Sequence, residues 1–594
     1  MSVAVRFDRL AGPVAFAVPW VFGLLNVSGS ATWSDDLAVA RAFGASPYGF
    51  EGLVSSGLAG LVAWVPVGTP LSRAASLSAL ALAAASLLLF RLSRQLLLSC
   101  GARPHALLPF IALLSALTAT LGPAFVAAGT LVGGGTVAAA LGLAALERNS
   151  QPFSPRSALL TGAFVALCLC ESRWTGLVVV GALVASWAAR KRELSVAVLS
   201  WVGAGALGIG LLPAALAVGF ASSSGSGLAG LWATRSSLSF SLDGAGSAVA
   251  DWIHGAGFIW AGLSLLGLGL ALLRRSARSL ACGLLALLVA GALESVETSP
   301  IVAAPVTGAR LLGIATLALT TGVGLSFLVE RLGRARLPFA RAAGALLLVY
   351  GFSLVFVSAE NASRETENRG RSLAEHWTDE AWLSLPPKSL LLVRSEAVFL
   401  RLMSSRTLAG SRPDVLIVPT SALDQSSVQL DLVEREAALV PIVRDVLLTG
   451  KPSELALTGL ADTRPMYVEL DPSWDSRLYP HLVPHAFFSE FSPHPLGRSD
   501  RNAGVEAASE RFAEVASAVR STPGRDPATR EVLGSSLSQR AILLEALGDR
   551  AAAMSVNEEL LALRADHPVG RALRARFAGK SNPSFDVRAL LASR

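Results

Sequence analysis

Two adjacent carboxylates, Asp35 and Asp36, stand a few residues after the first long apolar stretch of the chain. They open a polar loop, SDDLAVARAFGASPYGFEG, which leads into a shorter apolar run. Neighbouring carboxylates can serve as a general base, with one acid holding or charging the other, or can coordinate a divalent cation. An isolated Asp-Asp pair is common, so this chemistry is indicated only together with the place of the pair in the chain.

A second cluster, Glu171-Ser172-Arg173, lies in a tight turn between two apolar stretches. Two interpretations remain open. Arg173 can pair with Glu171 as a structural ion pair, or its planar guanidinium can hold a lipid phosphate.

Further candidates are scattered along the same half. Arg310 enters an apolar stretch and is another candidate phosphate ligand. His254 is either a side chain at the membrane interface or a substrate contact. Glu51, at the end of the loop that Asp35 and Asp36 open, is a further acid that can contact substrate.

The elements that must position these residues are membrane spans. The 594 residues are 52% hydrophobic and only 16% charged, whereas soluble domains contain about 25% charged residues. A span needs roughly 20 mostly apolar residues. We identify eleven candidate spans, several of them short, at residues 11–28, 74–92, 105–121, 123–146, 157–172, 174–189, 195–220, 252–273, 279–294, 308–328 and 339–358. The run 53–65 is too short to span comfortably and is predicted to be an interfacial or re-entrant helix.

Basic residues predict the orientation, because cytoplasmic segments carry an excess of Lys and Arg. With the N-terminus in the cytoplasm, seventeen basic residues of the apolar half face inward and five face outward. The outward ones are Arg41, Arg73, Arg173, Arg235 and Arg310. Counting 53–65 as a span would invert this bias. Eleven spans leave the C-terminal part outside, which is the periplasm if the protein sits in a bacterial inner membrane. All the candidate site residues then gather in one outer layer.

Charge and cysteine content exclude other classes. The apolar half holds 22 Lys and Arg against 12 Asp and Glu, and residues 359–594 hold 28 against 31. The basic character therefore belongs to the membrane half and gives no argument for nucleic acid. All four cysteines lie in the apolar half, so a disulfide framework is excluded.

The polar tail is predicted to form a soluble α/β domain over residues 359–500 and a helical segment over 501–594. Runs at 389–393, 414–419 and 464–470 indicate strands separated by helices, after a juxtamembrane helix at 360–379. The helix-Gly-Asp-helix-Pro layout near Gly548 is typical of a tetratricopeptide hairpin, which caps the α/β domain or binds an envelope protein. Three histidines in a Pro-rich loop, His481, His485 and His494, have a spacing that offers metal ligands. Without cysteine or a helical HxxxH setting zinc is not favoured, and no metal site is assigned.

The region from the first span to the second resembles a known family. Asp36, the Ala/Leu-rich stretch after it, the turn Ser46-Pro47-Tyr48-Gly49-Phe50-Glu51 and the following apolar run are similar to the N-terminal region of the domain-of-unknown-function 2723 family. That family includes transmembrane O-mannosyltransferase-like proteins of the GT-C glycosyltransferase superfamily. The phrase Arg412-Pro413-Asp414-Val415 also resembles one common in the family. Ser46, Tyr48 and Glu51 depart from the family's His, Pro and Pro.

The resemblance implies a GT-C-like membrane domain over residues 1–358, with its first outer loop at 29–73. It also implies transfer of a sugar from a polyprenyl-phosphate-linked donor at the outer face, with the carboxylate of Asp36 as general base. The lipid donor must present its phosphate at the membrane interface, where the acids and arginines of this chain gather. Arginine there would stabilise the charge of the departing phosphate.

Other functions remain open. One is a non-enzymatic membrane anchor or assembly factor that presents a periplasmic partner-binding domain, an idea favoured by the altered turn. Another is a flippase, polymerase or ligase for lipid-linked glycans. A transporter is disfavoured, because transporters place broken spans and charges at the membrane midplane.

Overall fold

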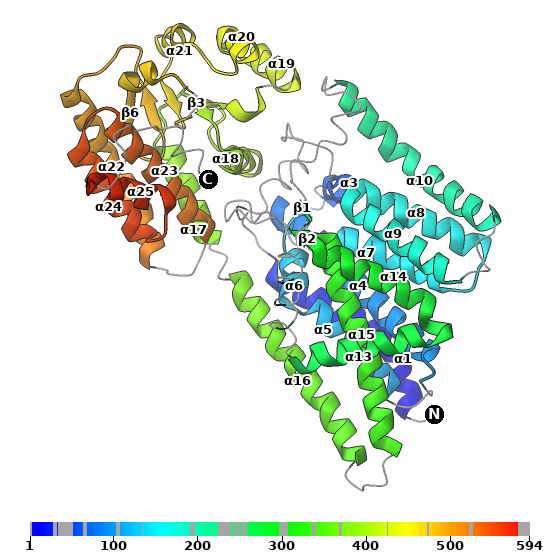
Figure 1. The fold of residues 1–594 in the computed structure, drawn as a ribbon. Helices are drawn as coiled ribbons and strands as arrows, with labels where there is room; N and C mark the ends of the chain where they lie inside the picture. Colours follow the sequence, from blue (N-terminus) through cyan, green and yellow to red (C-terminus); the bar gives the residue numbers. More distant parts are fainter. Residues whose placement is uncertain are drawn as a thin grey trace.

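The computed structural model describes residues 3–27, 33, 52–62, 68–102, 107–133, 135–190, 196–223, 239–240, 246, 250, 253, 258–295, 307–334, 340–367, 371–423, 426–471, 474–521 and 527–579. The described chain is mostly helical, and its helices form a bundle in the N-terminal half and surround a small sheet in the C-terminal half (Figure 1). We call the second part, residues 371–579, the α/β unit.

Apolar helices build the N-terminal half. They are α1 (Val3–Asn26), α3 (Leu53–Val62), α4 (Pro70–Ser99), α5 (Leu108–Thr120), α6 (Pro123–Gly129), α7 (Thr136–Ser150), α8 (Pro155–Glu171), α9 (Arg173–Arg190), α10 (Val196–Ser223), α13 (Phe258–Leu273), α14 (Arg275–Leu293), α15 (Gly308–Arg334) and α16 (Ala340–Glu367).

Several of these helices are long enough to cross a membrane. Within the described residues, four helices are long and apolar enough to cross a membrane, in α4, α14, α15 and α16. Helices α5 and α6 form a further apolar pair, bent by 64°. Shorter apolar helices lie at Leu10–Asn26, Val196–Leu211 and Phe258–Leu273. The chain is a membrane protein, and the number of eleven spans stays a prediction.

One predicted span is wrong as a continuous helix. The stretch 123–146 divides into α6, which ends at Gly129, and α7, which begins at Thr136. Residues 133–135 are three consecutive glycines in the sequence, and Gly133 has a φ of +62°, a conformation that ends a helix easily. The prediction at 53–65 corresponds to α3, whose ten residues extend about 15 Å and cannot cross a bilayer.

Local signals set where the helices begin. Thr69 accepts the Ser72 N–H and Pro70 follows it as the first helical residue of α4. At α8, Ser154 and Ser157 each accept the other's main-chain N–H, and Pro155 lies between them. A hydroxyl cap followed by proline is a favourable helix start, because proline lacks the N–H that would have no partner there.

Small residues let the helices approach closely. A Cβ on Gly267 of α13 would lie 1.8 Å from the Thr320 carbonyl oxygen of α15, and a Cβ on Gly324 would lie 2.2 Å from the Leu263 carbonyl oxygen. Contact of this kind is typical of membrane helices, which associate by close packing rather than by the hydrophobic effect.

The α/β unit contains a mixed five-stranded sheet of order β4-β3-β5-β7-β6. Its strands are β3 (Leu390–Val393), β4 (Leu416–Pro419), β5 (Met466–Val468), β6 (Leu482–Pro484) and β7 (Ser489–Phe491). Strand β3 is parallel to β4 and β5, and β7 is antiparallel to β5 and β6. All four residues of β3 are buried, as expected of a central parallel strand. The three predicted strands are therefore present.

Helices cover this sheet (Figure 1). They are α17 (Arg371–Leu383), α18 (Glu396–Ala409), α19 (Ser426–Arg435), α20 (Val440–Thr449), α21 (Glu454–Ala461), α22 (Arg498–Ser521), α23 (Pro527–Ala546), α24 (Arg550–Leu563) and α25 (Pro568–Phe577). The sheet and the last four helices share one hydrophobic core, with Trp377, Phe491 and Phe512 among its most buried side chains.

Some predictions for the tail need correction. The predicted loop with His481, His485 and His494 contains strands β6 and β7. The predicted juxtamembrane helix is divided between α16, which continues to Glu367, and α17. The domain limits stay predictions, with 358/359 lying inside α16 and 500/501 inside α22. The tetratricopeptide likeness of α23 and α24 also stays a prediction.

The phrase Arg412-Pro413-Asp414-Val415 has a structural explanation. Arg412, with a φ of 45°, donates to the carbonyl oxygens of Trp382, Leu385 and Pro386 at 2.7–2.8 Å. It also binds Asp414, and these hydrogen bonds hold the pKa of that carboxyl below its usual range. The phrase therefore fixes the connection between α17 and β3.

Candidate functional site

Three of the predicted site residues, Glu171, Arg173 and Arg310, lie in the described part of the membrane half. They gather at the end of the helices where α8 finishes and α3, α9 and α15 begin, which we call the site end. Four others lie outside the described residues, namely Asp35, Asp36, Glu51 and His254.

Glu171 connects α8 to α3. Its side chain is buried, and its Oε2 accepts the Ser55 N–H at 2.9 Å. Its carbonyl oxygen accepts the Gly52 N–H at 2.8 Å. A carboxylate at the first turn of a helix satisfies N–H groups that have no partner within the helix, and it interacts favourably with the helix dipole. Glu171 thus holds the start of α3, which follows the predicted outer loop of Asp35 and Asp36 in the sequence.

Arg173 is the first residue of α9, and its side chain is half-buried. The turn before it is tight, because Ser172 Oγ lies 2.9 Å from the Thr175 hydroxyl. The start of α15 lies against this turn, since a Cβ on Gly308 would lie 2.8 Å from Thr175 Oγ1. Arg173 and Arg310 therefore stand at the beginnings of two helices that touch each other. The structure brings these two predicted residues to the same region.

Glu294 is a residue of this region that was not among the predicted site residues. It follows α14 in a short strand, β2 (Glu294–Ser295), paired with β1 (Ser239–Phe240). The side chain is 1% exposed. Its Oε2 accepts the Thr307 hydroxyl at 2.5 Å, and Thr307 Oγ1 accepts the Arg310 N–H at 3.2 Å. Burial disfavours the charged form of this carboxylate, and the nearby charge of Arg310 offsets only part of that cost. Within the described residues, Oε1 has no hydrogen-bond partner.

A sequence signal for Glu294 existed. The residue directly follows an apolar span, and an acid at that depth needs a partner or a cavity because burial of a charge is costly. Its partners, Thr307 and Arg310, come after a further loop, so no spacing within one helix indicates them.

The site end can bind an anion and accept a proton. It combines two arginines, the beginnings of α9 and α15, and the carboxylates of Glu171 and Glu294. Helix beginnings and guanidinium groups both favour phosphate oxygens. Carboxylates in the same layer can accept a proton from a hydroxyl group.

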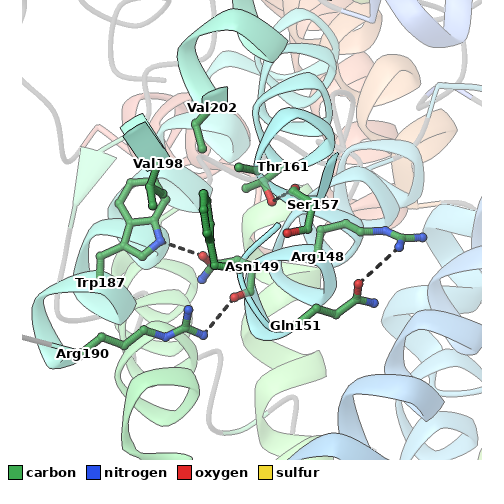
Figure 2. A pocket seen from close by; sticks show the side chains of 11 residues that line it. Arg148, Asn149, Gln151, Ser157, Thr161, Trp187, Arg190, Val198 and Val202 are labelled. Carbon is green, nitrogen blue, oxygen red and sulfur yellow. Dashed lines mark hydrogen bonds between the residues drawn. The ribbon is translucent and has the colours of Figure 1, made fainter. Parts of the chain in front are cut away.

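The opposite end of the bundle, where α4, α7 and α9 finish and α8 and α14 begin, is the basic end. Figure 2 shows a pocket there, with Trp187, Arg190 and Asn149 on its wall. Trp187 Nε1 donates to Asn149 Oδ1 at 2.7 Å, and Arg190 Nη2 donates to the Asn149 carbonyl at 2.9 Å. Arg190 Nε also donates to Ser279 Oγ at 2.8 Å. These groups bind one another and connect α7, α9 and α14.

A larger cavity of about 610 Å³ also opens at the basic end, between α1, α4 and α7. Arg91, Arg94 and the buried Glu147 line its polar side, and Phe16 and Phe90 line its apolar side. Arginine side chains therefore line both pockets at this end of the bundle. Which side of the membrane each end faces stays a prediction.

Two histidines of the α/β unit, His481 and His485, make contacts within its core. The described residues contain no group of three or more His, Cys, Asp or Glu side chains placed to hold a metal ion. His481 Nδ1 lies 2.9 Å from the Ser492 carbonyl oxygen, and its ring stacks on Phe491. Burial, together with the charges of Arg540 and Arg511, lowers the pKa of His485 to about 4. Both rings serve the core of the unit.

Comparison with known proteins gives the fold. No protein family matches the sequence, and no curated protein matches it. The apo crystal structure of ArnT from Cupriavidus metallidurans aligns with a TM-score of 0.53 at 15% identity, over 83% of this chain and 99% of that one. The structure of the same protein bound to undecaprenyl phosphate aligns with a TM-score of 0.50 at 14% identity, over 77% and 92%.

This chain therefore has the same membrane fold as ArnT. The membrane fold agrees with the one that the sequence resemblance implied, and membership of the GT-C superfamily stays a prediction. The relation to the domain-of-unknown-function 2723 family stays a prediction.

Proposed function

We propose that this protein is a glycosyltransferase that moves a sugar from a polyprenyl-phosphate-linked donor to an acceptor at the outer face of a bacterial inner membrane. The observation that carries the proposal is the fold, which aligns with 92% of an ArnT chain solved with undecaprenyl phosphate. The site end supports it, because arginines, helix beginnings and carboxylates gather at one end of the bundle and suit the binding of a phosphate group.

The reaction that fits these residues is a direct displacement at the anomeric carbon. Asp36 takes the proton of the acceptor hydroxyl as the acceptor oxygen attacks C1 of the sugar, and Asp35 adjusts the charge of Asp36. The bond between C1 and the phosphate oxygen breaks, and polyprenyl phosphate leaves with the electron pair. Arg173 and Arg310 bind the phosphate and stabilise its growing charge. Glu51 and His254 are proposed to contact the substrate.

The structure sharpens the role of Glu171. Because its carboxylate accepts the Ser55 N–H, we propose that it acts on the substrate indirectly, by holding α3 next to the loop. In this proposal the α/β unit lies in the periplasm, and its C-terminal helices remain a predicted surface for an envelope protein.

The test compares envelope glycans, by mass analysis, in cells with and without the gene. The wild-type gene should restore a glycan that the deletion strain lacks. Asp36→Asn keeps the size and much of the hydrogen bonding of the side chain but removes the base, so transfer should fall by about 10²-fold or more. Asp243→Asn, in another outer loop, is the matched control and should retain activity. Unchanged glycans in the deletion strain, or full activity of Asp36→Asn, would contradict the proposal.

A further inference from the structure

Trp33 lies in the α/β unit although it follows α1 in the chain. Its side chain is 6% exposed and belongs to the hydrophobic core of that unit. Its Nε1 donates to Thr529 Oγ1 of α23 at 2.8 Å. Its ring centroid lies 5.0 Å from that of Trp377 of α17, and the guanidinium of Arg401 of α18 lies over its face at 5.8 Å. The indole is buried in the core, and a hydrogen bond, an aromatic contact and a cation also fix its orientation.

The end of α1, seven residues before Trp33, is bound to α16, the helix that precedes the α/β unit. The Ser363 hydroxyl of α16 donates to Asn26 Oδ1 at 2.6 Å. Val27 and Leu408 of α18 pack against a small apolar cluster that α3 and α4 form. The α/β unit therefore touches the beginning of the first outer loop and also the helix that follows that loop.

Asp35 and Asp36 follow Trp33 by two and three residues. Three residues of chain extend no more than about 11 Å, so the seat of Trp33 limits where either acid can reach. We propose that Trp33 is a positioning residue, which sets from its seat in the α/β unit where the first outer loop presents Asp35 and Asp36 to the site end. This inference rests on the proposed function, in which Asp36 is the base. The α/β unit is then a part of the transfer site rather than a separate module.

Burial alone would give Trp33 a role in stability only, and the two roles predict different kinetics. A positioning residue acts on the chemical step, because a base displaced by about 1 Å can cost about 10²-fold in rate. It leaves the binding of the lipid phosphate unchanged, so kcat falls while the Kd of undecaprenyl phosphate stays constant. A purely stabilising residue lowers the melting temperature and leaves the kcat of the folded protein unchanged.

The first experiment measures transfer by the purified full-length protein. The readout is the release of undecaprenyl phosphate from lipid-linked sugars extracted from the cell's own membranes. Trp33→Ala should lower kcat by about 10- to 100-fold, with an unchanged Kd for undecaprenyl phosphate. Trp33→Phe keeps the ring contacts with Trp377 and Arg401 and should lower kcat less than Trp33→Ala does. Trp20→Ala removes an exposed tryptophan of α1 and serves as the control, without effect on kcat. A wild-type kcat in folded Trp33→Ala would overturn the proposal.

Milder variants keep the proposal testable if Trp33→Ala does not fold. Trp33→Phe and Thr529→Val each remove one side of the same hydrogen bond, and each should lower kcat by about 2- to 10-fold. The double variant should be no worse than either single variant, because the two changes remove one interaction. Additive losses of kcat, or no loss in either variant, would contradict the dependence of kcat on the hydrogen bond between Trp33 and Thr529.

A second experiment does not depend on the reaction. A p-benzoylphenylalanine in place of Trp33 should crosslink, on irradiation in membranes, to peptides of α17, α18 or α23, whereas the same probe in place of Trp20 should not. Absence of that crosslink would contradict the burial of Trp33 in the α/β unit. The crosslink without any transferase activity in the wild-type protein would sink the proposed function and, with it, the positioning role. The crosslink with normal transfer by Trp33→Ala would sink the positioning role alone.

Discussion

The two ends of the membrane helices use polar side chains in different ways. At the basic end, side chains bind one another across helices, as Trp187 and Arg190 do with Asn149. At the site end, carboxylates bind the first residues of other elements, as Glu171 does with Ser55 and Glu294 with Thr307. The first arrangement joins helices into a stable bundle. The second arrangement fixes the positions at which helices begin. Under the proposed function, these are the positions that contact a substrate at the membrane interface.

This difference predicts that variants at the site end change ligand binding, whereas variants at the basic end change stability. The strongest test concerns Arg173. If Arg173 binds the lipid phosphate, the double variant Glu171→Gln, Arg173→Ala should bind undecaprenyl phosphate about 10- to 100-fold more weakly, because a charged hydrogen bond is lost. Glutamine is chosen because it can still accept the Ser55 N–H. Arg173→Lys should recover only part of the affinity, since a point charge replaces a planar group.

Melting temperatures measured beside these affinities separate binding from folding. Undiminished affinity in a stable double variant would mean that Arg173 only balances Glu171, and the proposed contrast between the ends would lose its main support.

A matched change at the basic end should give the opposite result. Arg190→Ala leaves the Asn149 carbonyl and the Ser279 hydroxyl without their arginine donor, which should destabilise the protein by about 1–3 kcal/mol. The affinity for undecaprenyl phosphate should not change. Thermal unfolding of the purified protein measures the first effect and a binding titration the second. Weaker binding in a folded Arg190→Ala protein would remove the distinction between the two ends.

A smaller effect is expected where Glu171 holds α3. Glu171→Ala should cost about 0.5–2 kcal/mol of stability, in the range of a lost helix cap, and Glu171→Gln should cost less because its amide oxygen remains an acceptor. Chemical denaturation of both variants measures the difference. Equal losses would show that the charge of Glu171, rather than its hydrogen bond to Ser55, is what matters.

The smallest effect belongs to Trp187. Trp187→Phe removes the hydrogen bond to Asn149 but keeps the aromatic ring, so it should cost about 0.5–1.5 kcal/mol. Trp201→Phe, on the exposed face of α10, is the control and should change nothing. A loss of activity in Trp187→Phe without a loss of stability would be the unexpected outcome.

The sequence predicts local features of this molecule well and distant contacts poorly. Apolar runs bounded by arginine and proline locate the helices, because burial in lipid requires them. Three of the strands are visible as short apolar runs, because their side chains are buried in the core of the α/β unit. Strands β6 and β7 have three residues each, and Pro484 ends one of them, so no alternation of apolar and polar residues develops. The bend between α5 and α6 depends on a Gly-Pro pair that membrane helices often tolerate.

The candidate site was predictable only in part. Position along the chain indicated Glu171, Arg173 and Arg310 as residues of one layer, and the structure places all three at the site end. The partner of Glu171, Ser55, lies 116 residues earlier in the chain. A contact over such a separation leaves no local pattern of residue types, because it depends on how whole helices pack.

The contact between Trp33 and Thr529 has a consequence for folding during synthesis of the chain. The two residues are 496 positions apart. At about 5–20 residues per second, a ribosome needs roughly 25–100 s after making the indole before its hydrogen-bond acceptor exists. During that interval the nascent chain can insert its first helices but cannot seat the tryptophan. Translation that stops before residue 529 therefore yields a membrane-inserted fragment in which Trp33 lacks its hydrogen-bond acceptor. We expect proteases that remove incomplete chains to recognise such a fragment by its unburied tryptophan.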